Sequence, residues 1–297
     1  MHRSRFWTAL LWLGAAAVAP GPASAAEKRV EIPVDGGPIV ATLETPDAGG
    51  PTAAVLMLHG FTGTRDELAV EGAGEGVFER AARLFAEAGV ASLRIDFRGS
   101  GESGGEWRDT TFAGQIADAV AALDWMRAAP ELDGVETVAL GWSQGGLVAA
   151  HLAAERPDLA ALVLWAPAQN PLWNFSGFLG VETTMKALTA APQDEITFDL
   201  PWGGETTLRA AFWQEMARTD PVAAVARYPG PLLVIVGTRD DVVGPQPAAG
   251  AVFLRYHGGP QELVVLDTDH VFGVSAGPAT LDDMIARTLA FLAAAKG

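Results

Sequence analysis

Two hydrophobic periodicities alternate along this chain, and together they predict a series of strands and helices. Residues 29–34 and 38–44 alternate between apolar and polar side chains around Asp35-Gly36-Gly37, which predicts a β-hairpin. Short apolar runs predict strands at residues 53–58, 90–97, 135–140, 161–165, 232–236 and 262–266. Longer segments predict helices at residues 77–88, 112–129, 147–154 and 280–294. Such alternation is typical of an α/β fold with a mostly parallel central sheet flanked by helices.

Two segments add to this pattern. The predicted helix at 112–129 is amphipathic, and its apolar face consists of Ile116, Val120, Leu123 and Met126. Between about 169 and 220 the strand–helix rhythm is lost, and the segment is rich in aromatic residues. These are Trp173, Phe175, Phe178, Trp202, Phe212 and Trp213.

The most specific motif is Gly141-Trp142-Ser143-Gln144-Gly145-Gly146, between the strand at 135–140 and the helix at 147–154. A Gly-x-Ser-x-Gly sequence at a sharp strand-to-helix turn is typical of a nucleophile elbow, in which a strained serine projects its hydroxyl above the sheet. Side chains at positions 141 and 145 would collide with neighbouring backbone, so both positions favour glycine. We therefore expect Ser143 to be a nucleophile.

An acid and a histidine follow in the chain order that such a site requires. The strand at 232–236 is followed by Gly237-Thr238-Arg239-Asp240-Asp241, and the strand at 262–266 by Asp267-Thr268-Asp269-His270. Catalytic groups of open α/β sheets lie at the carboxyl ends of strands. We predict a triad in which His270 takes the proton of Ser143 and Asp240 holds the imidazole. Asp241 is the alternative acid, but Asp240 has the favoured spacing after the glycine.

A third strand end predicts an oxyanion hole. The strand at 53–58 is followed by His59-Gly60-Phe61-Thr62-Gly63. We predict that the backbone N–H groups of Phe61 and Gln144 bind the oxyanion, since such groups stabilise the charge that develops during acyl transfer. Because both donors are main-chain atoms, replacing either side chain should cost much less than the roughly 10²–10³-fold loss of a donor. His59 is expected to brace this loop by hydrogen bonding.

These motifs occur in one order with Asp96-Phe97-Arg98-Gly99-Ser100-Gly101-Glu102-Ser103 and Leu164-Trp165-Ala166-Pro167-Ala168. Together they resemble the α/β-hydrolases grouped with serine aminopeptidases and monoacylglycerol lipases, and most closely the bacterial cinnamoyl and feruloyl esterases. The resemblance covers about residues 30–295 and is weaker between about 169 and 220. It implies an α/β-hydrolase fold with a small cap insertion at about 169–220, and a serine ester hydrolase with no cofactor. One departure is Trp142-Ser143-Gln144, where many relatives carry His-Ser-Met; it affects the shape of the acyl pocket.

The aromatic residues of the cap admit two interpretations. They can line an apolar or aromatic pocket for the acyl or alcohol group, or they can pack the cap onto the core. The substrate-binding candidates are Trp142, Trp173 and Trp213.

The N-terminus predicts a secretory signal peptide at residues 1–25. It has a basic start, an apolar run from Phe6 to Val18, and small residues at Ala23-Ser24-Ala25 before a cleavage point at Ala26. The run is shorter than the roughly 20 residues of a membrane span. We expect a periplasmic or secreted protein with one domain at 26–297 and no stable membrane anchor after cleavage.

Composition limits the partners. The 49% of hydrophobic residues can form a large core, and the chain has no cysteine, so it forms no disulfide. The net charge is −16, and −18 without Arg3 and Arg5 of the predicted signal, leaving 18 basic against 36 acidic residues. Such an acidic surface argues against nucleic acids and anionic membranes as partners. A small-molecule ester is the expected partner, and the oligomeric state stays open.

Several other motifs favour structural roles. The glycine-rich run at 99–104 follows a strand, but no helix N-terminus follows closely enough to bind a pyrophosphate. Asp96 and Arg98 in this loop are expected to form a structural ion pair. Asp267, Asp269 and His270 are a weak metal signal, because no second histidine is near. Of the remaining histidines, His151 is expected to pack on its helix and His257 to lie in a surface loop.

Two other functions remain open. The same triad could cleave peptide or amide bonds, and an aminopeptidase would need an acidic anchor in the cap for the substrate ammonium. The candidate anchors are Glu182, Asp194, Glu195 and Glu215. A non-catalytic binding protein that keeps the fold is the third hypothesis.

Overall fold

The computed structural model describes residues 26–47 and 49–295, so the predicted signal peptide at 1–25 lies outside the described residues. Eight strands pair into one sheet in the order β1-β2-β4-β3-β5-β6-β9-β10. They are β1 (Ala26–Ile32), β2 (Ile39–Thr45), β3 (Ala54–Leu58), β4 (Ala91–Ile95), β5 (Thr137–Trp142), β6 (Ala161–Trp165), β9 (Leu232–Gly237) and β10 (Gln261–Leu266).

Strand pairing follows the hydrophobic pattern. β2 pairs antiparallel with β1 and with β4, and every other neighbouring pair is parallel. β3, β4, β5, β6 and β9 are buried at every residue, as parallel strands covered on both faces must be. The predicted hairpin and the predicted mostly parallel sheet are therefore confirmed.

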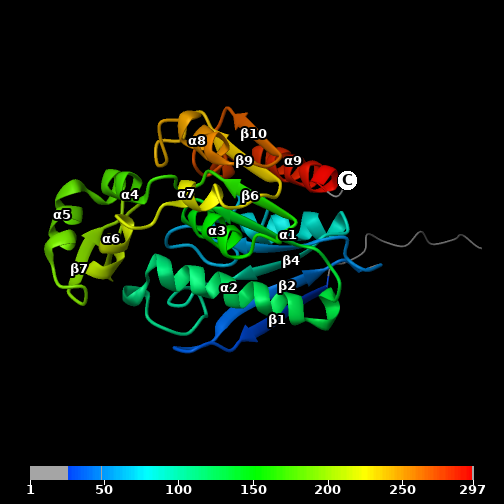
Figure 1. Cartoon of the computed structure of the whole chain (residues 1–297), viewed down its shortest axis with the longest axis horizontal. Helices are drawn as coiled ribbons and strands as arrows, with labels where there is room; N and C mark the ends of the chain where they lie inside the picture. The colour runs from blue at the N-terminus through cyan, green and yellow to red at the C-terminus, as the bar shows by residue number, and fades with distance from the viewer. Residues whose placement is uncertain (1–25, 48, 296–297) are drawn as a thin grey trace, which may run out of the picture.

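Helices cover both faces of the sheet (Figure 1). The helix α1 (Val77–Glu87) packs against α9 (Ala279–Ala295) on one face. The other face carries α2 (Phe112–Ala128), α3 (Gln144–Glu155), α7 (Pro221–Val225) and α8 (Ala248–Tyr256). Short 3₁₀ helices occur at Trp107–Asp109, Pro130–Leu132 and Val274–Ala276. Within the described residues no helix is long and apolar enough to span a membrane.

The buried face of α2 differs from the expected one. Leu123 and Met126 are buried, but Ile116 and Val120 are only partly buried. α2 packs against α3, and alanines lie on its buried face. Two polar residues share this face because each has a hydrogen-bond partner. The full buried set is Phe112, Gln115, Asp118, Ala119, Ala122, Leu123 and Met126.

Between β6 and β9 the chain leaves the sheet and forms a separate layer. This layer consists of α4 (Pro171–Leu179), α5 (Val181–Thr189), the hairpin of β7 (Glu195–Asp199) with β8 (Glu205–Arg209), and α6 (Ala210–Met216). The first helix begins at Pro171, where the side-chain oxygen of Asn170 accepts the Trp173 N–H at 3.0 Å. We call residues 171–216 the cap.

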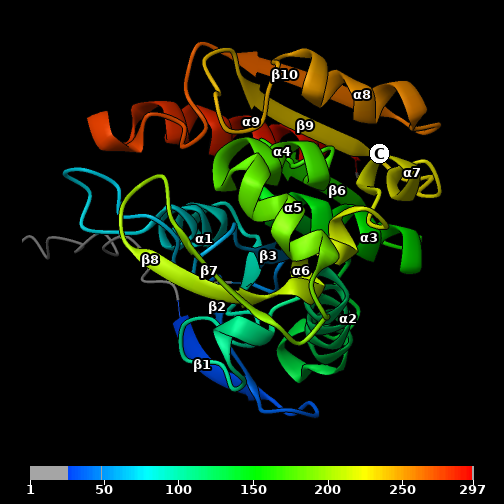
Figure 2. The same cartoon turned by 90° about the vertical axis from the view of Figure 1, so that its left-hand side faces the viewer.

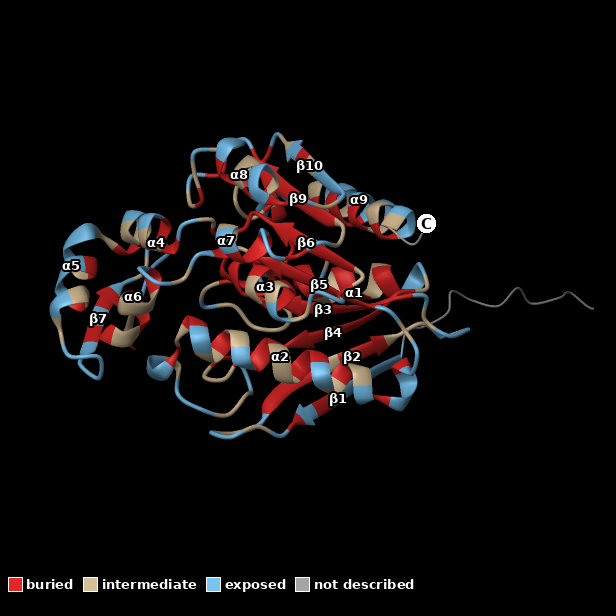
Figure 3. Ribbon diagram, in the orientation of Figure 1, coloured by how far each residue is buried: buried red, intermediate tan, exposed pale blue. Residues whose placement is uncertain are grey.

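The cap lies at one end of the molecule, and Figure 2 shows it facing the viewer. Figure 3 shows the sheet as the buried centre, whereas much of α5 is exposed. The inner side of the cap packs on α2, where the rings of Phe112 and Phe212 stack with centroids 4.9 Å apart. The cap therefore shares the core of the sheet domain, because four of its aromatic residues belong to the same cluster of buried side chains: Phe175, Phe198, Phe212 and Trp213.

Candidate active site

Ser143 lies at the turn between β5 and α3. Its backbone has φ 56° and ψ −114°, a left-handed conformation that costs energy for a residue with a side chain. A Cβ at Gly141 would overlap the carbonyl of Gly145, and a Cβ at Gly145 would overlap the carbonyl of Leu58. The Gly-x-Ser-x-Gly spacing thus follows from the close packing of α3 against β3 and β5.

The structure brings Ser143, Asp240 and His270 together from three strand ends. The Nε2 atom of His270 lies 3.0 Å from Ser143 Oγ, and its Nδ1 atom lies 2.8 Å from Asp240 Oδ2. The other carboxyl oxygen of Asp240 accepts the N–H groups of Val242 and Val243 at 2.9 and 2.8 Å. Asp241, the alternative acid, is exposed. An acid fixed in this way keeps the His270 imidazole in the tautomer that can accept a proton from Ser143.

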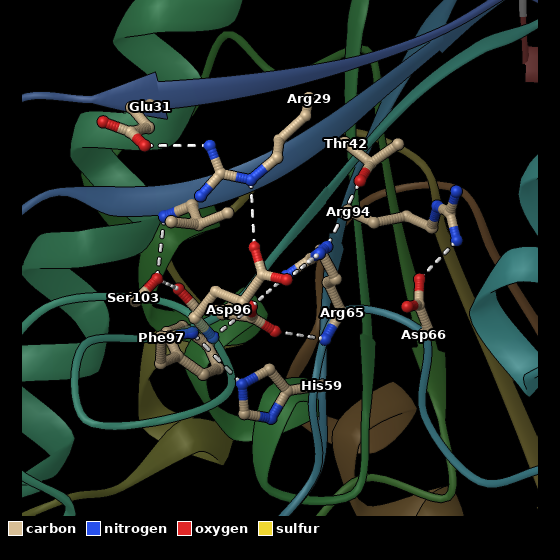
Figure 4. Close-up of polar contacts among 12 residues, drawn as sticks. Arg29, Glu31, Thr42, His59, Arg65, Asp66, Arg94, Asp96, Phe97 and Ser103 are labelled. Atoms are coloured by element: carbon tan, nitrogen blue, oxygen red, sulfur yellow. Dashed lines mark hydrogen bonds and ion pairs between the residues drawn. The ribbon is translucent and has the colours of Figure 1, made fainter.

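Hydrogen bonds of His59 hold the loop after β3, and Figure 4 shows the one that joins His59 to Phe97. His59 Nδ1 lies 2.8 Å from the Gly60 carbonyl, and Nε2 accepts the Phe97 N–H at 3.1 Å. The first contact needs a proton on Nδ1 and the second needs a bare Nε2, so His59 is neutral. Burial lowers the pKa of His59 to about 4, which keeps this tautomer at neutral pH. His59 therefore braces the loop, as expected.

Asp96 does not pair with Arg98, contrary to expectation. Its carboxylate binds the side chain of Arg65 and accepts the Arg65 N–H at 2.7 Å and the Glu102 N–H at 3.0 Å. Arg98 instead pairs with Asp118 of α2. The reason is that Asp96 already binds Arg65 and the loop amides, whereas the carboxylate of Asp118 also accepts the backbone N–H of Arg98, at 2.9 Å.

Of the two residues whose amides are expected to bind an oxyanion, Gln144 directly follows Ser143, and Phe61 lines the same cavity as Ser143. Among the described residues, neither the Phe61 N–H nor the Gln144 N–H donates to a protein acceptor. Gln144 is the first residue of α3, so its amide also belongs to the positive end of the helix dipole. Free amides beside a nucleophile are suited to stabilise negative charge on a substrate oxygen.

Ser143 and His270 open into a cavity of about 300 Å³ between the sheet and the cap. Its walls are mainly apolar and include the aromatic residues Phe61, Trp142, Phe175, Phe178 and Trp202. The ring of Phe61 lies at the centre of this group, with its centroid 5.3 Å from that of Phe175 and 5.8 Å from that of Phe178. The cavity can therefore hold a flat, apolar group beside the serine.

The three candidate tryptophans lie in three different environments. Trp142 lines the cavity and donates its Nε1–H to the His270 carbonyl at 3.3 Å. Trp173 is 67% exposed and lines a separate cavity of about 630 Å³ between the cap and α8. Trp213 lines neither cavity, because it is fully buried between Phe198 and Phe212, so the expectation was wrong for this residue.

Two polar residues of the cavity were missed by the sequence reasoning. Asn174 is 3% exposed; its Oδ1 accepts the Asn170 N–H at 3.2 Å, and its Nδ2 has no partner among the described residues. Glu67 is partly buried and accepts the Gly60 N–H. The sequence held a signal for each residue: Glu67 follows the His-Gly loop closely, and Asn174 lies among the aromatic residues of the cap. Burial raises the pKa of Glu67 to about 8.

The remaining histidine and acid predictions have mixed outcomes. His151 Nδ1 lies 3.0 Å from the Leu147 carbonyl, and the partly buried ring packs on its helix as expected. His257 was expected at the surface but is 6% exposed and stacks on Tyr228, because α8 ends there against the core. Within the described ranges no three His, Asp or Glu side chains gather as metal ligands. Asp269 instead accepts the Gly273 N–H at 2.8 Å.

A mostly parallel sheet of this order, with a serine at the turn after β5 beside a histidine–carboxylate pair, defines the class of α/β-hydrolases. The predicted fold class is confirmed. The chain belongs to the prolyl oligopeptidase family, whose match spans residues 77–297. It is therefore a hydrolase of the α/β fold.

Solved structures agree with this class. The protein Est1E of Butyrivibrio proteoclasticus, solved with bound ferulic acid, has a TM-score of 0.71 and 25% identity over 89% of this chain and 97% of that one. An esterase of Pyrococcus furiosus shares the fold with a TM-score of 0.65 and 21% identity over 92% of both chains. A dienelactone hydrolase of Anabaena variabilis shares it with a TM-score of 0.61 and 20% identity over 90% of this chain and 96% of that one. The resemblance expected from the motifs is confirmed.

Curated relatives match shorter segments. An uncharacterized protein of Rickettsia prowazekii is 30% identical over 99 residues, which are 33% of this chain and 40% of that protein. An uncharacterized protein of Mycobacterium tuberculosis is 30% identical over 196 residues, which are 66% of this chain and 55% of that protein. The matched region thus spans less than two thirds of each relative.

Proposed function

We propose that this protein is an exported serine hydrolase that cleaves carboxylic esters through Ser143, His270 and Asp240. Ser143 Oγ attacks the ester carbonyl carbon while His270 Nε2 takes the hydroxyl proton, and the oxyanion binds the amides of Phe61 and Gln144. The intermediate collapses to an acyl-enzyme as His270 gives its proton to the leaving alcohol. Water, activated by His270, then attacks the acyl-enzyme and releases the acid and free Ser143.

The observation that carries this proposal is the hydrogen-bonded series from Asp240 through His270 to Ser143, which opens into a cavity walled by aromatic rings. The distances of 2.8 and 3.0 Å suit proton transfer without rearrangement. Asn174, whose buried Nδ2 has no partner among the described residues, supplies a polar group that can fix a substrate's orientation in such a pocket.

Aromatic acyl esters, such as hydroxycinnamoyl esters, and short acyl esters are the proposed substrates. The cavity volume of about 300 Å³ and its aromatic walls fit a single substituted ring. Est1E, at 25% identity, has been solved with ferulic acid, which supports the same class of acyl group for this chain. The buried Asn174 Nδ2 favours an acyl group that carries an oxygen, because an unpaired donor is costly to leave buried.

A peptidase or amidase is the alternative, and the description of the prolyl oligopeptidase family favours it. The cap carboxylates do not supply the ammonium anchor that an aminopeptidase needs. None of the four candidates lines the cavity, and Glu195 instead pairs with Arg108, while Glu215 accepts the Ala113 N–H. We therefore favour ester over peptide hydrolysis.

Export is proposed from the N-terminal sequence: a signal peptide at 1–25, a periplasmic or secreted location, and one domain at 26–297 with its cap insertion at about 169–220. The acidic charge supports a small-molecule ester, rather than a nucleic acid, as the partner.

The test compares the purified wild type with Ser143→Ala on p-nitrophenyl butyrate, methyl ferulate and an aminoacyl-nitroanilide. We expect ester turnover by the wild type, a loss of about 10⁴-fold or more in Ser143→Ala, and labelling of the wild type alone by a fluorophosphonate probe. Nitroanilide turnover comparable with ester turnover would favour the peptidase. Absence of both turnover and labelling would leave a non-catalytic binding protein.

A further inference from the structure

Glu67 places a carboxyl group in the wall of the proposed catalytic cavity, and the acyl-transfer steps above make no use of it. It lines the same cavity as Ser143 and His270. Within the described ranges it forms no ion pair, although its side chain is partly buried. A carboxyl buried without a cation is costly in its charged form, so its presence calls for a reason.

The carboxyl contacts both glycines of the loop that carries the Phe61 amide. The Gly60 N–H donates to Glu67 Oε1. A Cβ at position 63 would lie 2.7 Å from one carboxyl oxygen and 2.8 Å from the other, so a side chain there would displace this group. The Gly63 N–H donates to the Gly60 carbonyl at 3.2 Å and closes the turn.

The segment from Gly60 to Glu67 needs support, because two of its residues adopt left-handed backbone conformations that disfavour side chains. Thr62 has φ 60° and Glu67 has φ 63°. Each such residue costs roughly 1–2 kcal/mol relative to a right-handed conformation. The hydrogen bond from Gly60 to Glu67 joins the two ends of the strained segment, and so fixes the position of the Phe61 amide, which lies between them in the chain.

Among residues 26–47 and 49–295 no cation forms an ion pair with Glu67, and no charged side chain is a cause of its raised pKa. The titratable side chains that precede it in the loop after β3 are His59, Arg65 and Asp66, and His270, which follows Asp269, lines the same cavity. Arg65 binds Asp96, and Asp66 binds Arg94 (Figure 4), so each of these side chains has a partner other than Glu67. His59 is neutral, and Asp269 accepts the Gly273 N–H. His270 is bound to Asp240.

Glu67 therefore carries a proton at neutral pH. Burial raises its pKa to about 8, and the opposing effect of the Gly60 N–H is smaller. A neutral acid can accept the Gly60 N–H without placing a net charge in the cavity.

We propose that Glu67 is a positioning residue. As the neutral acid it holds the Gly60–Gly63 turn, and its ionisation slows acyl transfer by placing a negative charge beside the oxyanion. The inference rests on the proposed function, since it assigns the Phe61 amide to the oxyanion hole.

The distances set the size of the effect. A Cβ at Gly60 would lie 3.4 Å from Glu67 Oε1 and 3.5 Å from Ser143 Cβ, so the carboxyl is close to the reacting serine. Two like charges about 7 Å apart at an effective dielectric constant of about 20 shift an equilibrium by roughly 50-fold. The positive charge on His270 in the transition state offsets part of this repulsion. We therefore expect kcat/KM to fall about tenfold when Glu67 ionises.

The experiment measures kcat/KM for p-nitrophenyl butyrate between about pH 6 and pH 10 in wild type, Glu67→Gln and Glu71→Gln. Glu71, which is exposed, is the matched control. Wild type and Glu71→Gln should lose activity above about pH 8, whereas Glu67→Gln, which cannot ionise, should stay level. Thermal unfolding at each pH separates this effect from denaturation.

The outcomes are distinguishable. A wild-type profile that stays level up to about pH 10, or an alkaline loss that persists in Glu67→Gln, would overturn the proposal for Glu67 while leaving the esterase intact. If Glu67→Gln does not fold, the wild-type pH profile alone still tests the proposal, because a level profile would overturn it and a loss of activity above about pH 8 would support it. A wild type with neither ester turnover nor fluorophosphonate labelling would overturn both proposals.

Discussion

Replacing Asp240 by asparagine tests the proposed triad with the least change in shape. Asp240 uses one carboxyl oxygen to accept the amides of Val242 and Val243, and the other to bind His270 Nδ1 at 2.8 Å. Asparagine has only one acceptor oxygen, and the two amides retain it. Its NH₂ group must then face His270, and an NH₂ group can pair only with a bare Nδ1.

This change inverts the imidazole tautomer. With Nδ1 bare, the proton of neutral His270 moves to Nε2, which lies 3.0 Å from Ser143 Oγ and can no longer accept the serine proton. The expected loss is about 10⁴-fold in kcat, or roughly 5.5 kcal/mol of transition-state stabilisation. The fold should be retained, because both hydrogen bonds to the amides remain.

The assay is steady-state turnover of p-nitrophenyl butyrate at about pH 7.5, together with the rate of fluorophosphonate labelling. Asp241→Asn is the matched control, since Asp241 is adjacent but exposed, and its activity should stay within about twofold of the wild type. A loss of less than about tenfold in Asp240→Asn, or a larger loss in Asp241→Asn, would refute the assignment of the acid.

Three further predictions concern specificity and stability. Asn174→Leu should reduce the ratio of kcat/KM for methyl ferulate to that for methyl cinnamate by about tenfold, because the buried Nδ2 donor is removed. An unchanged ratio would show that no substrate oxygen binds to Nδ2. Trp213→Ala should lower the free energy of unfolding, measured in urea, by about 3–5 kcal/mol, because Trp213 is fully buried. Trp173 is exposed, so Trp173→Ala should lower it by less than about 1 kcal/mol, and equal losses would contradict the burial of Trp213. Burial raises the pKa of Glu44 to about 7 and that of Glu67 to about 8, both from 4.5, so their neutral forms stabilise the fold at low pH. Wild type should therefore lose stability relative to Glu67→Gln as the pH rises from about 5 to about 9, and the opposite trend in thermal unfolding would count against the raised pKa.

The hydrophobic pattern determined the sheet and the positions of the strand ends. β3, β5 and β9 are buried at every residue, so each had to be a continuous apolar run that stands out in the sequence. The glycines at 141 and 145 were equally informative, because their constraint is local: a Cβ at either position meets backbone within the same turn or the adjacent strand. The sequence by itself therefore placed Ser143 and His270 at two strand ends.

The tertiary structure decided what depends on contacts between distant segments. Arg98 binds Asp118 rather than the neighbouring Asp96, and Trp213 packs inward rather than lining the cavity. Asp240 and Asp241 are chemically identical, and only the fold turns one of them toward His270. Glu67 is an ordinary acidic residue in the sequence, and its raised pKa exists only because the folded chain removes water and supplies no cation. Backbone geometry and hydrophobic periodicity are local properties, whereas burial and charge pairing are set by the packing of the whole chain.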